Sequence, residues 1–125
     1  YKKGIGAHMD FAGVSAADKA TYLASKAVKQ VAADLTMSDI MLQKYISMYV
    51  HGAIETWVDM RRFKYSADIY KGFTLPTTLF VDNGGKPAYR VRPRYNSEYV
   101  WNRTSLDKIG GNNNDYHTYE LWFSK

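Results

Sequence analysis

The stretch from Gln43 to Tyr65, QKYISMYVHGAIETWVDMRRFKY, constrains the fold more than any other part of the chain. Its apolar residues recur every three or four positions and fill two adjoining stripes of a helix, with a break at His51-Gly52. A helix that is apolar over so wide an arc packs between neighbours rather than on a surface. The stretch therefore predicts two helices joined by a short turn, a helical hairpin that runs to about Tyr65.

The residues before this hairpin also predict helices. Residues 1–11 have the spacing of a short amphipathic helix that ends at Gly13. Ser15 and Asp18 have the spacing of a capping box, so a second, alanine-rich helix begins there and runs to about Ala24. Residues 26–35 fit a helix or an extended segment equally well.

A second capping box precedes the hairpin itself. Thr36 and Asp39 stand three residues apart, directly before the apolar run that begins at Ile40. A hydroxyl and a carboxylate at this spacing satisfy free backbone amides, so we expect the first hairpin helix to begin here.

The second half of the chain, residues 66–125, is rich in loop-forming residues. Residues 77–92 predict a small β-hairpin, because β-branched and aromatic residues flank Asn83-Gly84-Gly85, which can adopt positive φ angles. Residues 94–102 are expected to be irregular or a short helix, and residues 104–108 to form one capped turn. The sequence GGNNND that follows is a loop by composition.

These patterns predict a mainly α protein whose residues 1–125 form a single unit, helical over residues 1–65 and loop-rich over residues 66–125. There is no cysteine, which excludes disulfides and thiolate chemistry. No apolar run is long enough to span a bilayer, and the start shows no signal-peptide pattern. The chain starts without an initiator Met, apparently within a helix, which indicates a fragment of a longer protein.

The net charge of +5 is dispersed along the chain. Residues 1–65 carry nine Lys and Arg against six Asp and Glu, and residues 66–125 carry eight against six. A nucleic-acid-binding face would concentrate the basic residues, so this distribution argues against one. The 11 Tyr and 3 Trp instead suit a surface that recognises polar ligands, although a single Tyr is more often part of a core.

A charged cluster lies in the second hairpin helix. Glu55, Asp59 and Arg62 follow one another on one helix face. One interpretation is that Glu55 and Asp59 are the paired catalytic carboxylates of a glycoside hydrolase. That chemistry needs carboxylates on opposite sides of a cleft, so we interpret the cluster as an ion-pair network that fixes helix packing. Arg61 stands four residues after Trp57, close enough to stack on the indole.

Two other patterns bear on function. Arg90, Arg92 and Arg94 alternate along the second strand of the predicted β-hairpin, either as an edge that binds anions or, as we favour, as an exposed face that protects the sheet edge. The three histidines lack metal-ligand spacing, and no phosphate loop, nucleophile elbow or other cofactor motif is present. The histidines are His8, His51 and His117.

The hairpin sequence resembles the hallmark of the SusD-like (SusD/RagB) outer-membrane lipoproteins, in which a QKY helix and a Gly precede an E-x-W-x-D-x-R-R helix. The corresponding residues are Gln43-Lys44-Tyr45, Gly52, Glu55, Trp57, Asp59, Arg61 and Arg62. Tyr1 to Met9, Gly13-Val14 and Tyr22-Leu23-Ala24 are similar to the usual lead-in of the family. Arg92 to Glu98 resembles its R-x-P-Y-P-x-x-E segment, with Asn96 where proline is common, and the terminal ELWFSK resembles its C-terminal end.

The resemblance covers essentially the whole chain and implies the C-terminal portion of a larger SusD-like fold, built on tetratricopeptide-like helix pairs. It implies a protein that is not an enzyme, needs no cofactor, and binds a nutrient, with a glycan as the expected ligand. It also implies nutrient uptake at the cell surface with a TonB-dependent, SusC-like outer-membrane transporter, and a lipid anchor in residues upstream of this chain.

The resemblance supplies no binding residues, because the hallmark residues are structural and ligand contacts vary among family members. Exposed rings in the loop-rich half are the best candidates for a ligand site, and sugars stack on such rings. They are Tyr95, Tyr99 and Trp101. The alternative function is a basic domain that binds polyanions or nucleic acid, which a salt titration would separate from glycan binding.

Overall fold

The computed structural model describes residues 1–125 without a gap, and its regular elements are all helical. Two compact units are present, the N-terminal unit (residues 1–73) and the C-terminal unit (residues 74–125). The prediction of a mainly α protein is confirmed. That residues 1–125 act as a single unit stays a prediction.

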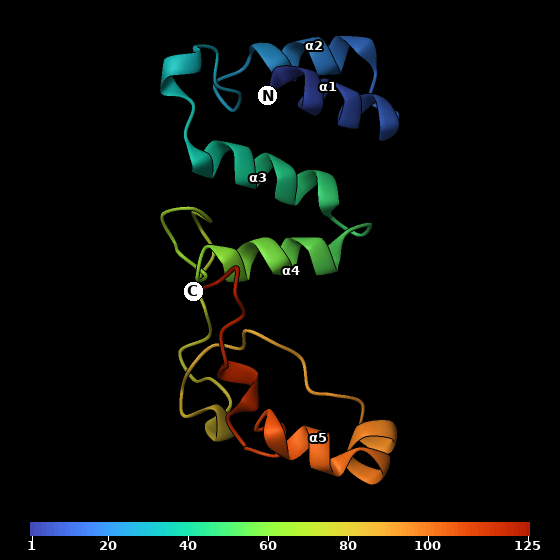
Figure 1. The fold of residues 1–125 in the computed structure, drawn as a ribbon. Coiled ribbons are helices and arrows are strands. Elements are labelled where there is room, and N and C mark those ends of the chain that lie inside the picture. The colour runs from blue at the N-terminus through green and yellow to red at the C-terminus, as the bar shows by residue number, and fades with distance from the viewer. The chain divides into compact units, whose positions relative to one another are not determined.

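Four helices build the N-terminal unit, and they lie as two antiparallel pairs in successive layers (Figure 1). The first pair is α1 (Lys2–Phe11) and α2 (Ala16–Ala24), and the second is α3 (Met37–Met48) and α4 (Ala53–Arg62). Helix α1 also contacts α3. Between the pairs, the segment left open by the sequence contains one 3₁₀ turn, η1 (Ala32–Asp34).

The capping residues begin the helices where the sequence predicts. The Ser15 hydroxyl accepts a hydrogen bond from the Asp18 amide at 3.1 Å, at the start of α2. At the start of α3, Thr36 and Asp39 form the complete reciprocal capping box. The hydrogen bonds from the hydroxyl and amide of Thr36 hold the pKa of the Asp39 carboxyl below its usual value.

The turn between α3 and α4 lies at the predicted break, and it contains an uncommon backbone conformation. Val50 has φ +70° with its side chain 78% exposed, and Gly52 caps α4. A positive φ in a β-branched residue is strained. Helix α4 ends at Arg62, before the predicted end at Tyr65, because Lys64 and Tyr65 both adopt left-handed conformations.

The core of the N-terminal unit is small. Its buried apolar side chains are Ile5, Val28, Met41 and Tyr70. The buried Ser38 hydroxyl of α3 donates to the Ile69 carbonyl at 2.7 Å, which ties the segment after α4 to α3. None of the helices is both long enough and apolar enough to cross a lipid bilayer.

The C-terminal unit contains short helical turns connected by extended loops. These are η2 (Val81–Asn83), the π-helix η3 (Tyr95–Tyr99), α5 (Arg103–Lys108) and η4 (Tyr116–Thr118). Its buried apolar residues are Tyr89, Leu106 and Tyr116. Leu106 packs so closely on Gly111 that a Cβ atom there would lie 2.3 Å from its Cδ1.

The β-hairpin predicted over residues 77–92 is wrong, because the structure contains no strand. The turn itself is present, with Gly84 and Gly85 at φ +61° and +71°. The amides of Tyr89 and Arg90, however, both donate to the His117 carbonyl, at 2.7 and 3.1 Å. The segment after the turn therefore pairs with a part of the chain that is distant in sequence, instead of with the segment before the turn.

Candidate functional site

Two of the three candidate ligand-binding rings form a stacked pair on η3. The rings of Tyr95 and Tyr99 have centroids 5.4 Å apart with 26° between their planes. Tyr95 is 72% exposed, whereas Tyr99 is half-buried and its hydroxyl donates to the Gly111 carbonyl at 2.8 Å. The Tyr99 ring is thus held in place beneath Tyr95, whose ring is open to solvent. We call these two residues the tyrosine platform.

Trp101 lies two residues beyond η3 and is 86% exposed. It makes no ring contact with either tyrosine of the platform, so the structure does not bring the third candidate residue into the stack. Its indole remains a separate exposed aromatic surface in the same segment of chain.

Sequence reasoning missed the residue that supports the platform. The Arg92 guanidinium donates from Nη1 to the Tyr99 hydroxyl and the Gly111 carbonyl, both at 3.2 Å. From Nη2 it donates to the carbonyls of Asn113 and Asn114, at 3.0 and 2.6 Å. The available signal was the pairing of an arginine with the glycine- and asparagine-rich loop, whose exposed carbonyls need donors.

Arg90 has an equivalent structural role elsewhere in the C-terminal unit. Its Nε and Nη2 donate to the carbonyls of Tyr119 and Glu120, at 2.7 and 2.9 Å. Its guanidinium also lies over the rings of Tyr116 and Tyr119, at 5.1 and 5.7 Å from their centroids. These contacts close the unit around its C-terminal segment.

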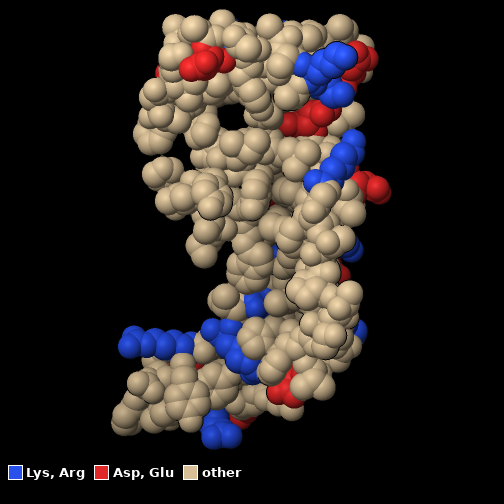
Figure 2. All heavy atoms as spheres, turned by 180° about the vertical axis from the view of Figure 1, so that it is seen from behind, with Lys and Arg blue, Asp and Glu red and all other residues tan.

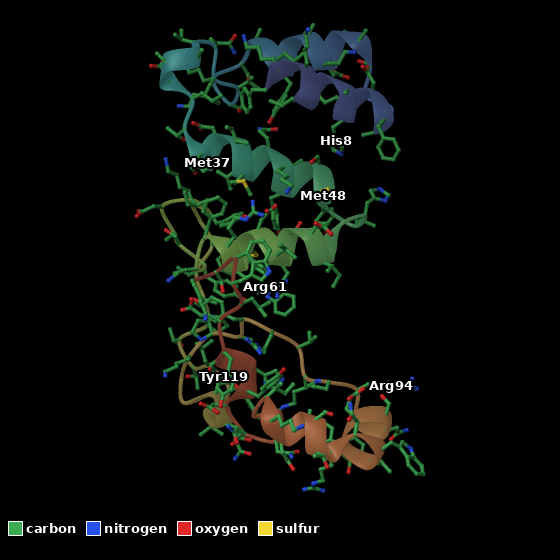
Figure 3. The ribbon with its side chains drawn as sticks, in the orientation of Figure 1. His8, Met37, Met48, Arg61, Arg94 and Tyr119 are labelled. Atoms are coloured by element: carbon green, nitrogen blue, oxygen red, sulfur yellow. The ribbon has the colours of Figure 1, made fainter.

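Both interpretations of the alternating arginines, an anion-binding edge and an exposed strand face, are wrong because no strand is present and the side chains diverge. Arg90 and Arg92 are half-buried on carbonyl oxygens, and only Arg94 is exposed and directed outward (Figure 3). Over α1 to α4, basic and acidic groups are interspersed among uncharged ones on the face shown in Figure 2. The bonds of Arg90 and Arg92 to carbonyl oxygens leave no row of free arginines that could bind a polyanion.

Two hallmark residues of α4, Trp57 and Arg61, make structural contacts. The Arg61 guanidinium carbon lies 3.8 Å from the Trp57 ring centroid, as their spacing predicts, and Arg61 Nε donates to the Trp57 carbonyl at 3.1 Å. The indole Nε1 of Trp57 donates to the Tyr65 hydroxyl at 2.8 Å. Burial raises the pKa of the Tyr65 phenol, so this hydroxyl stays protonated at neutral pH.

The two acidic residues of α4 lie in different surroundings. Asp59 is 5% exposed and pairs with the Lys44 ammonium of α3 at 2.5 Å. Glu55 and Arg62 are exposed, and neither forms an ion pair. The ionic contact that joins α3 to α4 is therefore Lys44 with Asp59.

Tyr70 packs near this ion pair. Burial raises the pKa of its phenol to about 12, and the Asp59 charge acts in the same direction.

No three acidic or histidine side chains lie close enough together to hold a metal ion. His8 stacks on Phe11, and His51 meets the same ring edge-on with centroids 5.6 Å apart. The third histidine, His117, has a buried Nδ1 without a hydrogen-bond partner.

The N-terminal unit also contains a groove of about 570 Å³ between α1, α2 and α3. Its lining is mainly aliphatic and includes Ile5, Met9 and Ile40. Two of its polar groups satisfy each other, because the Gln43 amide donates to the Tyr22 hydroxyl at 3.0 Å. Tyr1 and Tyr22 also line this groove, but the structure shows no stacked pair of rings in it like the tyrosine platform.

The layered helical pairs of the N-terminal unit define a helical-hairpin protein. A family model described as "SusD-like_2: Starch-binding associating with outer membrane" matches residues 1–91. The chain therefore belongs to the SusD-like family. No curated protein and no solved structure matches it. The match includes the helical pairs and the Trp57–Arg61 contacts and ends before η3, so the tyrosine platform lies outside the matched residues.

Proposed function

We propose that the protein binds a glycan at the surface of the outer membrane, and that it does so without catalysis. The family description supports a starch-like ligand and an association with the outer membrane. The observation that carries the proposal on this chain is the tyrosine platform, in which an exposed Tyr95 ring stacks on a Tyr99 ring anchored at its hydroxyl. The apolar face of a sugar ring stacks on such a surface, and Trp101 offers a second, separate exposed ring in the same segment of chain.

The experiment is calorimetric titration of the full chain with maltoheptaose, a soluble fragment of starch. We expect Tyr95→Ala to weaken binding about tenfold, because a lost aromatic stacking contact costs about 1.4 kcal/mol. Trp101→Ala should weaken binding by a similar factor. Trp122→Ala is the matched control, because Trp122 is also 86% exposed but lies outside the η3 segment. Equal affinity of all variants would contradict the proposed site.

Polyanion binding is the competing function, and salt separates the two. Stacking of a neutral glycan should respond little when salt rises from about 50 to 500 mM, whereas phosphate contacts weaken steeply over this range. Arg90 and Arg92 donate to backbone carbonyls of the protein itself, which favours glycan binding over polyanion binding. Tight, salt-sensitive binding of single-stranded DNA would favour the polyanion.

We further propose that the natural protein is lipid-anchored through residues upstream of this chain and acts in nutrient uptake with a TonB-dependent, SusC-like transporter. Support comes from the family description and from the large apolar side chains that the N-terminal unit exposes at the ends of its helices, a feature typical of interaction surfaces. These are Phe11, Tyr49, Val50 and Ile54. Co-purification of the natural protein with a transporter from outer membranes tests the partnership, and substitution of Tyr49 and Ile54 by Ser should reduce it.

A further inference from the structure

We propose that Arg92 is a positioning residue for the tyrosine platform: it fixes Tyr99 and the loop of residues 110–114 in the geometry that a glycan meets, without touching the glycan. This inference rests on the proposed function, because it assigns a role within the same site. It goes beyond that function in naming which interaction makes the platform competent to bind.

The geometry of the guanidinium carries the inference. Its two terminal nitrogens make four hydrogen bonds, to the Tyr99 hydroxyl and to the carbonyls of Gly111, Asn113 and Asn114. These oxygens belong to two segments, η3 and the loop after α5, which the Tyr99–Gly111 hydrogen bond also joins. One planar side chain therefore bonds the Tyr99 ring and three carbonyls of the loop at the same time, and so fixes their relative position together with the Tyr99–Gly111 bond.

The Tyr99 hydroxyl is fixed from two directions. It accepts a hydrogen bond from Arg92 and donates one to the Gly111 carbonyl, so both the position and the rotation of the ring are determined. The exposed Tyr95 ring stacks on this fixed ring. Affinity improves when a binding surface is already ordered, because less conformational entropy is lost when the ligand binds.

Arg92 itself is unsuited to direct recognition. The four bonds to protein oxygens occupy the four terminal N–H groups, so of the five donors only the Nε–H is left for a ligand. Lysine cannot replace it, since an ammonium has three donors and lacks the planar fork that reaches four oxygens at once.

Arg90 provides a matched control within the same unit. It is also half-buried and also donates to backbone carbonyls, those of Tyr119 and Glu120. Its bonds do not involve η3 or the loop after α5. Arg90→Lys should therefore lower the stability of the C-terminal unit while leaving the platform in place.

The test measures maltoheptaose affinity by calorimetry and the melting temperature of the full chain for R92K, R90K and Y99F, well below the melting temperature of each. We expect R92K to weaken binding about fivefold or more and R90K to leave it within about twofold, with comparable losses in melting temperature. Y99F removes only the hydroxyl that Arg92 holds, so it should weaken binding in the same direction even if R92K folds poorly.

A double-mutant cycle separates positioning from a general structural effect. In a Tyr95→Ala background, R92K should cause little further loss of affinity, because the surface that Arg92 positions is already absent. Equal losses of affinity in R90K and R92K, or unchanged affinity in both R92K and Y99F, would overturn the proposal. Failure of the unsubstituted chain to bind maltoheptaose would overturn the starch-like ligand and this role together, whereas normal binding with an unaffected R92K overturns this role alone.

Discussion

Three arginines of this chain have uncharged groups among their partners. Arg61 lies on an indole ring and donates to a carbonyl of its own helix, while Arg90 and Arg92 donate to loop carbonyls. A guanidinium suits this role because its charge strengthens each bond and its planar fork reaches several oxygens. A positive net charge in such a chain therefore does not indicate an equally positive binding surface.

The Lys44–Asp59 pair predicts an asymmetry between two substitutions. Lys44→Met leaves the buried Asp59 carboxylate without its counter-charge and should destabilise the protein by about 3 kcal/mol. Asp59→Asn removes the buried charge and leaves an ammonium that is already 43% exposed, so it should cost only about 1 kcal/mol. Urea unfolding followed by circular dichroism measures both, and equal losses would show that the ion pair is not the stabilising contact.

His117 predicts a dependence of stability on pH. Burial, with the Arg92 charge acting in the same direction, lowers the pKa of its imidazole below the usual value of 6.5. The folded state therefore binds this proton less readily than the unfolded chain does. The contribution of His117 to the stability of the folded state is fully present above about pH 6.5, and it is lost as the pH falls toward the lowered pKa.

Melting temperatures measured from pH 8 to pH 5 test this expectation. His117→Gln should make the curve flatter, because the titrating group is absent, while His8→Gln serves as the control for a histidine in the other unit. A slope that is unchanged in His117→Gln would contradict the assignment.

At the scale of elements, the turn between α3 and α4 carries strain that one substitution can remove. Val50 adopts φ +70° and has few contacts to lose, since its side chain is 78% exposed. Val50→Gly should stabilise the protein by about 0.5 to 1 kcal/mol, because glycine adopts this conformation freely and the gain exceeds its entropic cost in the unfolded chain. Thermal unfolding checks the sign, and Val50→Ala, which retains a Cβ atom, should recover little of the gain.

The helices could be predicted from sequence because their determinants are local. The capping residues Ser15 and Thr36 lie within three positions of the amides that they satisfy, and the α3–α4 break falls at its glycine. The prediction of a β-hairpin was wrong because the amides of Tyr89 and Arg90 donate to the carbonyl of His117, which is distant in sequence. Local residue preference cannot show which of two possible hydrogen-bond partners a segment will meet.

Only part of the candidate site could be predicted from the sequence, namely the part that depends on neighbouring residues. Tyr95 and Tyr99 stand four residues apart, so any helical turn brings their rings together, and their selection required only local reasoning. Trp101 was selected for its ring type, yet it makes no contact with the pair. Arg92 was missed because its role depends on a loop about twenty residues further along the chain.

At the scale of the whole molecule, the division into two units predicts where proteolysis begins. Lys71 is exposed and is followed by Gly72 at φ +87°, just before the boundary between the units. Two other cationic positions, Lys86 and Arg92, precede proline, which trypsin does not cleave. We expect limited trypsin digestion to cut early at Lys71 and release a helical fragment of residues 1–71, identified by mass spectrometry and circular dichroism. Early cuts within α3 or α4 instead would contradict the expectation.

The unusual way in which the C-terminal unit is held together has a calorimetric consequence. Its buried apolar side chains are few, Tyr89, Leu106 and Tyr116, and much of its cohesion comes from guanidinium groups on peptide carbonyls. Exposure of apolar surface raises the heat capacity on unfolding, whereas exposure of polar surface lowers it. The heat-capacity increment of this unit should therefore fall below the usual value of about 12 to 15 cal/mol/K per residue, which gives its stability a shallow dependence on temperature.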